Sequence, residues 1–105
     1  MNVCIVSGRL LKNAVARGTE PKTLTFTLEN RYGSNGSEGS DKVTYVPCVM
    51  FNPTPEIEAL LTTQGQNLQV ELEGRIMGSN PEKERRFNTE VIVRNKSLAI
   101  LGPPA

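Results

Sequence analysis

The chain has 105 residues, of which 12 are basic and 11 are acidic, and its formal net charge is +1. This length fits one domain with a modest core, so we treat residues 1–105 as a single domain. The net charge of a nearly neutral chain does not by itself indicate a polyanionic partner. Any surface that binds one has to come from a local cluster of basic residues. No apolar run approaches the roughly 18 residues of a membrane span, and Met1-Asn2-Val3 leads straight into a strand pattern, so we expect neither a membrane span nor a signal peptide.

The chain lacks the groups on which most enzymes and metal sites depend. It has no histidine, and Cys4 and Cys48 are too few for a zinc site. It also has no G-x-x-x-x-G-K-[ST] phosphate loop. We therefore predict a binding protein rather than an enzyme, without cofactor or metal. Both cysteines lie in strand-like runs, which favours reduced thiols in a cytoplasmic protein, although a disulfide between them stays open.

The first half of the chain is predicted to form strands. Asn2 to Leu11 is rich in β-formers and apolar on both faces, which is typical of a strand covered on both sides or used in a subunit interface. Gly8 within it indicates a bulge or a sharp coil. Lys12 to Lys22 is interpreted as a polar connection. Thr23 to Leu28 alternates cleanly, which predicts a strand whose leucines and Phe26 face the core. The Gly/Ser-rich stretch Gly33 to Ser40 follows and is typical of a long flexible loop.

Val43 to Phe51 (V-T-Y-V-P-C-V-M-F) predicts the strand around which the rest of the chain is organised. Successive side chains of a strand point to opposite faces. One face then carries Val46, Cys48 and Met50, which suits a core, and the other carries Tyr45 and Phe51. Rings on an outer face indicate that something stacks on them. The alternative from the pattern alone is that these rings cover a subunit interface.

A short helix is predicted next, followed by three more strands. Thr54 is a good N-cap, Pro55 fits the first helical position, and Gly65 closes the helix. The strands are predicted at Asn67–Ile76, Phe87–Val93 and Ser97–Leu101. This order of elements predicts an all-β fold, a five-stranded Greek-key OB-fold barrel with one short helix between strands 3 and 4. The second and third strands of such barrels, with their neighbouring loops, bind oligonucleotides.

Five motifs in the same order resemble those of the bacterial single-stranded DNA-binding protein family. They are N-V-C-I-V-S-G-R-L (2–10), L-T-F-T-L-E-N-R-Y (24–32), T-Y-V-P-C-V-M-F (44–51), L-Q-V-E-L-E-G-R-I (68–76) and R-F-N-T-E-V-I-V (86–93). Two departures stand out. Tyr45 stands where the family usually has tryptophan, and Pro47 replaces a residue that is often basic. The family's long tail with an acidic, Phe-terminated tip is not expected here, because the sequence stops at Ala105.

The resemblance implies binding and protection of single-stranded DNA in replication, repair or recombination, in a cytoplasmic, nucleoid-associated protein. The implied base-stacking residues are Tyr32, Tyr45, Phe51 and Phe87. The resemblance also points to Arg9 as a phosphate contact. Further candidates are basic side chains that lie mostly in loops expected beside the binding face. The full set of candidate phosphate-binding residues is Arg9, Lys12, Arg17, Lys22, Arg31, Lys42, Arg75, Lys83, Arg85 and Arg86.

The expected partners are single-stranded DNA, replication or restart proteins, and a second copy of the chain. The apolar first strand favours a homodimer or homotetramer through edge pairing. Two alternatives remain. One is a short primosomal replication-restart protein of the same fold. The other is a protein–protein adaptor on an OB-fold scaffold that binds little nucleic acid, because a fold does not fix a function.

Overall fold

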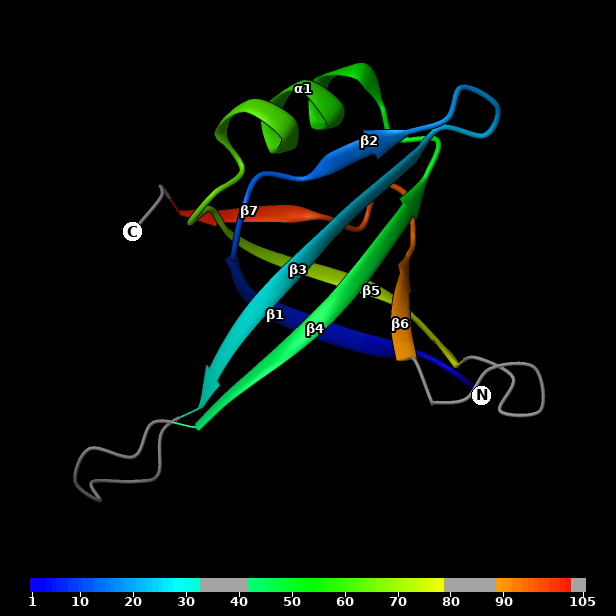
Figure 1. Ribbon diagram of the computed structural model, residues 1–105. Helices are drawn as coiled ribbons and strands as arrows, with labels where there is room; N and C mark the ends of the chain where they lie inside the picture. Colours follow the sequence, from blue (N-terminus) through cyan, green and yellow to red (C-terminus); the bar gives the residue numbers. More distant parts are fainter. Residues whose placement is uncertain (33–41, 79–88, 103–105) are drawn as a thin grey trace, which may run out of the picture.

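The computed structural model of the protein describes residues 1–32, 42–78 and 89–102. The described residues form seven strands and one helix (Figure 1). In chain order these are β1 (Cys4–Leu10), β2 (Val15–Arg17), β3 (Thr23–Tyr32), β4 (Lys42–Phe51), α1 (Pro55–Gln64), β5 (Gln69–Gly78), β6 (Thr89–Val93) and β7 (Ala99–Gly102). The loop predicted at Gly33 to Ser40 lies outside the described residues.

Five of these strands close a barrel. Their order around it is β1-β3-β4-β6-β5, and β5 pairs back onto β1. The β4–β6 pairing is parallel and the others are antiparallel, so the barrel is mixed. Outside the barrel, β2 pairs with β3 and β7 with β5. The predicted five-stranded barrel is confirmed, with its helix between β4 and β5, the third and fourth barrel strands in chain order.

The barrel closes because β1 changes its partner within its own length. Cys4 to Arg9 pair with β5, whereas Arg9 and Leu10 pair with β3. Gly8 lies at this crossing, where a Cβ atom would sit 2.7 Å from the carbonyl oxygen of Glu29. Only glycine allows the two backbones to approach so closely, which agrees with the sharp coil expected at this position.

The core follows the alternation seen in the sequence. Its fully or almost fully buried side chains come from β1, β3, β4, α1, β5 and β6, and include Leu10, Leu24, Phe26, Leu28, Cys48, Met50, Leu61, Val70, Leu72, Val91 and Val93. The predicted inner faces of β3 and β4 are thus confirmed. Both cysteines are free thiols, Cys48 buried and Cys4 half-buried. Burial, and to a lesser extent the neighbouring Cys4, raises the pKa of the Cys48 thiol to about 12, so this thiol stays protonated at neutral pH.

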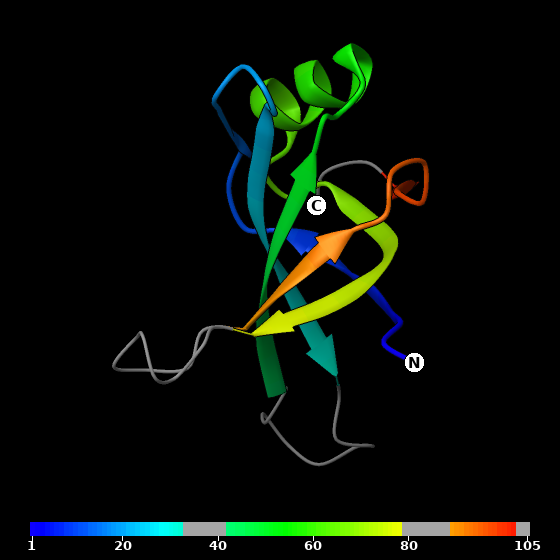
Figure 2. The ribbon, with the colours of Figure 1, turned by 90° about the vertical axis from the view of Figure 1, so that its right-hand side faces the viewer.

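The helix α1 begins and ends where its capping residues predict. The Thr54 hydroxyl accepts a hydrogen bond of 3.3 Å from the Ile57 amide, and Gly65 forms the C-cap. Leu61 is buried against the core, and α1 lies at one end of the barrel, at the top of both views (Figures 1 and 2). No helix within residues 1–32, 42–78 and 89–102 has the length and apolarity needed to cross a membrane.

One predicted connection contains a strand. Lys12 to Lys22 was expected to be a polar connection, but Val15 to Arg17 form β2, which pairs with Thr23 to Thr25 of β3. The segment is held in place from its other side as well, because the amide of Ala14 donates a hydrogen bond of 2.8 Å to the carbonyl oxygen of Leu61 in α1. A three-residue strand gives too little alternation to be detected in a sequence, and it forms here because β3 offers a pairing edge.

Candidate functional site

The outer surface of β3 and β4 consists of five cross-strand rows. The antiparallel register places odd-numbered residues of the two strands opposite one another, while the even-numbered residues from Leu24 to Leu28 and from Val46 to Met50 pack in or against the core. The two strands lie side by side along their whole length (Figures 1 and 2). We call this surface the β3–β4 face. Its rows are Thr23–Phe51, Thr25–Val49, Thr27–Pro47, Glu29–Tyr45 and Arg31–Val43.

Both predicted rings of β4 point to solvent on this face. Tyr45 is 58% exposed and Phe51 is 41% exposed, which confirms the predicted outward orientation. Six positions along a strand that rises about 3.4 Å per residue separate the two rings by about 20 Å. They therefore form two separate candidate sites for stacking, which we call the ring stations, rather than one aromatic cluster. Their role in base stacking remains a prediction.

An arginine accompanies each ring. Arg17 of β2 pairs with Thr23, whose partner on the other side is Phe51, so Arg17 extends the first row. Arg31 of β3 stands in the row next to that of Tyr45. Each end of the β3–β4 face therefore presents a ring and a guanidinium group, the pair that a stacked base and its phosphate require.

A buried carboxylate lies in the row of Tyr45. Glu29 is only 5% exposed, and its two oxygens accept hydrogen bonds from different arginines. The Arg31 Nε donates to Oε1 over 2.6 Å, and an Arg9 guanidinium nitrogen donates to Oε2 over 2.6 Å. Arg9 also donates to the side-chain oxygen of Asn67. The hydrogen bond from Arg31, with that from Arg9, holds the pKa of Glu29 below its ordinary value of 4.5, although burial opposes this.

This ion-pair cluster should make folding sensitive to acid. Because the pKa of Glu29 is lower in the folded state, its contribution to stability is present above the ordinary pKa and is lost as the pH falls through the folded pKa. We expect Glu29→Gln to flatten the loss of urea resistance between about pH 5 and pH 3. Glu56→Gln, at an exposed residue of α1, serves as the control. Equal pH slopes in the wild type and both variants would contradict the role of Glu29.

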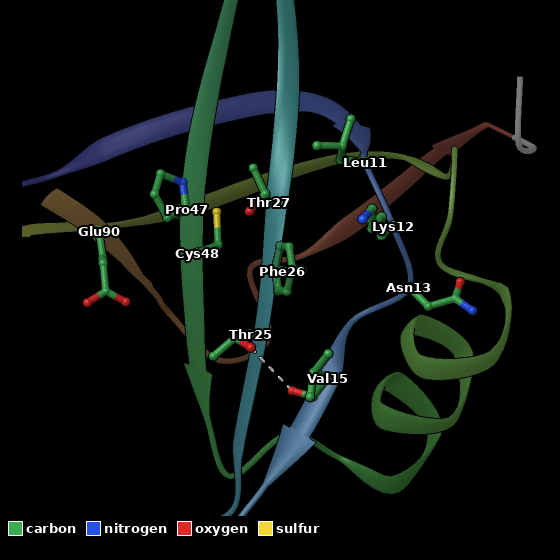
Figure 3. A pocket seen from close by; sticks show the side chains of 10 residues that line it. All are labelled: Leu11, Lys12, Asn13, Val15, Thr25, Phe26, Thr27, Pro47, Cys48 and Glu90. Atoms are coloured by element: carbon green, nitrogen blue, oxygen red, sulfur yellow. Dashed lines mark hydrogen bonds between the residues drawn. The ribbon is translucent and has the colours of Figure 1, made fainter. Parts of the chain in front are cut away.

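A hollow of about 400 Å³ occupies the middle of the β3–β4 face, across the rows of Thr25 and Thr27 and between the two ring stations. We call it the central hollow. Figure 3 shows that the residues after β1 line it beside β3, and that Glu90 of β6 lies beyond β4 on the opposite side. Its lining residues are Leu11, Lys12, Asn13, Val15, Thr25, Phe26, Thr27, Pro47, Cys48 and Glu90.

The other predicted site residues lie on several elements, and Arg75 is on β5, which β6 separates from β4. Lys12, Arg17, Lys42 and Arg75 are exposed and form no ion pair with any carboxylate of the described residues. Lys22 lies 3.0 Å from a carboxylate oxygen of Glu58. The backbone of Tyr32 pairs with that of Lys42 at the end of β3. The predicted residues Lys83, Arg85, Arg86 and Phe87 lie outside the described residues.

Sequence reasoning did not identify the two acidic residues of this surface. Glu29 directly follows the alternating stretch Thr23 to Leu28, and its sequence context assigns it no role. Glu90 belongs to the T-E-V motif, in which alternation with the buried Val91 could have placed it on the outer face. Among the described residues, no group of three His, Cys, Asp or Glu side chains is arranged to hold a metal ion.

Comparison with known proteins points in the same direction as the geometry. The sequence model of the Single-strand binding protein family matches residues 1–99. A Plasmodium falciparum SSB, solved as a complex with ssDNA, has the same fold, with a TM-score of 0.72, 18% sequence identity and coverage of 97% of this chain and 96% of that chain. This likeness confirms the predicted OB-fold. No curated protein matches the sequence.

Proposed function

Since the chain belongs to the single-strand binding protein family, whose members bind without catalysing a reaction, we propose that it binds single-stranded DNA along the β3–β4 face. The family also confirms the prediction that the protein is not an enzyme. The observation that carries the proposal is the pair of exposed rings, Tyr45 and Phe51, on one strand of this face. The ssDNA in the solved Plasmodium complex supports it.

The proposed mechanism is passive. A base stacks on Tyr45 and another on Phe51, and each stack contributes about 1–3 kcal/mol whatever the base, because every base has a π-face. The guanidinium groups of Arg31 and Arg17 contact the phosphates beside them, which makes the affinity depend on salt.

The exposed Lys12 and Lys42 extend the cationic surface of this proposal, and a phosphate contact of Arg75, on β5 beyond β6, remains a prediction. Arg9, Arg31 and Lys22 are all engaged by carboxylates. Of the two arginines paired with Glu29, the 60% exposed side chain of Arg31 is more available to a phosphate than the 27% exposed side chain of Arg9. The stacking roles of Tyr32 and Phe87 and the phosphate contacts of Lys83, Arg85 and Arg86 remain predictions. We further propose roles in replication, repair or recombination in the cytoplasm, with replication or restart proteins as additional partners.

We also propose self-association through β1. From Cys4 to Val6 this strand pairs with β5 on one side, and no described strand pairs with its other edge. Val3 and Ile5 beside this edge are exposed. An unpaired apolar edge is a template for a second copy, giving a homodimer or a dimer-based tetramer. Ile5→Lys should shift the species seen by analytical ultracentrifugation toward monomer, whereas an unchanged mass would exclude β1 as the interface.

The proposed function is tested by fluorescence anisotropy of a labelled oligo-dT of about 35 nucleotides, which spans several OB-fold sites. We expect tight binding at low salt that weakens as salt rises, because counterions are released from the phosphates. A duplex of the same length should bind much more weakly, because its bases are not available to Tyr45 and Phe51. Absence of binding at low salt would instead favour the protein–protein adaptor.

A further inference from the structure

We propose that Glu90 makes the central hollow selective for bases with an exocyclic amino group, so that cytosine is preferred there over thymine. This inference rests on the proposed function, because it concerns the base that lies between the two ring stations.

The strand pairing places Glu90 beside the middle of the β3–β4 face. Cys48 and Val49 of β4 pair in parallel with Val91 and Ile92 of β6, which brings Glu90 next to Pro47. Val91 is buried in the core, so the alternating Glu90 side chain points outward. Its carboxylate is exposed and has no ion-pair or hydrogen-bond partner within residues 1–32, 42–78 and 89–102.

A carboxylate that has no partner in the described part of the chain is unexpected on a surface that binds a polyanion. It repels phosphates and contributes nothing to their binding. The arginines of the face stand at its two ends, with Arg17 in the row of Phe51 and Arg31 next to the row of Tyr45, and Lys12 lies on the side of the hollow opposite Glu90. This charge pattern favours a DNA strand whose phosphates lie near the two ends of the β3–β4 face. Between them, the edge of a base rather than the DNA backbone then faces Glu90. A base edge is also the only part of DNA that offers hydrogen-bond donors to a carboxylate.

The two sides of the central hollow differ in hydrogen-bonding character. Glu90 on the β6 side only accepts, whereas Lys12 on the opposite side only donates and the Thr27 hydroxyl does both (Figure 3). Cytosine matches this arrangement, because its N4 amino group donates and its N3 and O2 atoms accept. Thymine carries the O4 acceptor where cytosine carries N4, and its one base-edge donor, N3–H, lies between the O2 and O4 carbonyl oxygens. A carboxylate that accepts from this N3–H is therefore held close to two further acceptors, which disfavours thymine at Glu90.

Size does not separate the two pyrimidines. The hollow of about 400 Å³ is large enough for either ring, and Pro47 offers a flat apolar surface between Thr27 and Glu90. Discrimination must therefore come from hydrogen bonding. A ligand that leaves polar groups of the site unpaired is rejected strongly, whereas a ligand that differs only by one methyl group is rejected weakly.

The experiment measures the dissociation constants of the full chain for oligo-dT and oligo-dC of equal length, at a mildly alkaline pH that keeps cytosine N3 unprotonated. The quantity compared is the ratio of Kd for dT to Kd for dC, which cancels effects common to both strands. We expect Glu90→Gln and Glu90→Ala to lower this ratio about fivefold or more, the effect of losing one good base contact.

Glu56→Gln is the matched control, since it removes the same charge from an exposed residue of α1 that does not line the hollow. It should change both affinities together and leave the ratio unaltered. An unchanged ratio in both Glu90 variants, or an equal change in Glu56→Gln, overturns the inference. Failure of the wild type to bind either oligonucleotide would overturn the proposed function itself, and the two failures are thus distinguishable.

Discussion

Replacing Tyr45 and Phe51 together by alanine is expected to weaken binding of single-stranded DNA by about 2–6 kcal/mol, which is at least thirtyfold in Kd, because two base stacks of about 1–3 kcal/mol each are lost. The two rings stand about 20 Å apart along β4. Sites this far apart with no shared partner normally act independently, so the two single substitutions should add up to the double one.

The loss should be one of affinity and not of folding. Both rings are exposed on the β3–β4 face, while the core side of the same strand is filled by Cys48 and Met50. We would measure Kd by anisotropy at one fixed salt concentration and stability by urea unfolding. Leu101→Ala is the control, because it truncates an exposed apolar side chain on β7, away from this face. Unchanged Kd values in both single variants would remove the rings from the site.

Gly74→Ala is expected to destabilise the barrel by about 1–3 kcal/mol, the usual range for forcing extra atoms into a packed region. A Cβ atom at this position would lie 2.4 Å from the carbonyl oxygen of Ile92 and 2.8 Å from a methyl carbon of Val91. The first contact is with backbone of the paired strand β6, which cannot rotate away as a side chain can. The two strands would have to separate where Gly74 of β5 pairs with Val93 of β6.

The free energy of unfolding from urea titrations followed by circular dichroism measures this effect. Gly102→Ala is the matched control, because a Cβ atom there would meet nothing within 4 Å. It should leave stability within about 0.5 kcal/mol of the wild type. Equal stability of the two variants would mean that β5 and β6 can move apart at no cost.

Most of the fold could be predicted because its signals are local. The alternation of Leu24, Phe26 and Leu28 decides which face of β3 is buried, and Thr54 decides where α1 begins. The strand β2 was missed because its three residues carry no periodicity of their own. Its existence depends on the free edge of β3, which is a property of the assembled sheet.

The site could be predicted only in part, for the same reason. Alternation along β4 was enough to place Tyr45 and Phe51 on the outer face. The sequence could not show which cations are already engaged, because Arg9 reaches Glu29 only after β1 crosses β3. Nor could it show that Glu29 is buried, since acidic residues are rarely buried unless paired and its partners come together through folding.

The change of partner within β1 sets a limit on how this chain can vary in length. Arg9 belongs to two ladders at once, and each fixes the register of the other. Inserting or deleting one residue between Val6 and Leu10 would slip one ladder by a position, and a slip of one turns every side chain beyond it to the opposite face. Substitutions in β1 can be compatible with the barrel, whereas a change of length between Val6 and Leu10 puts the ladder with β3 out of register with the ladder with β5.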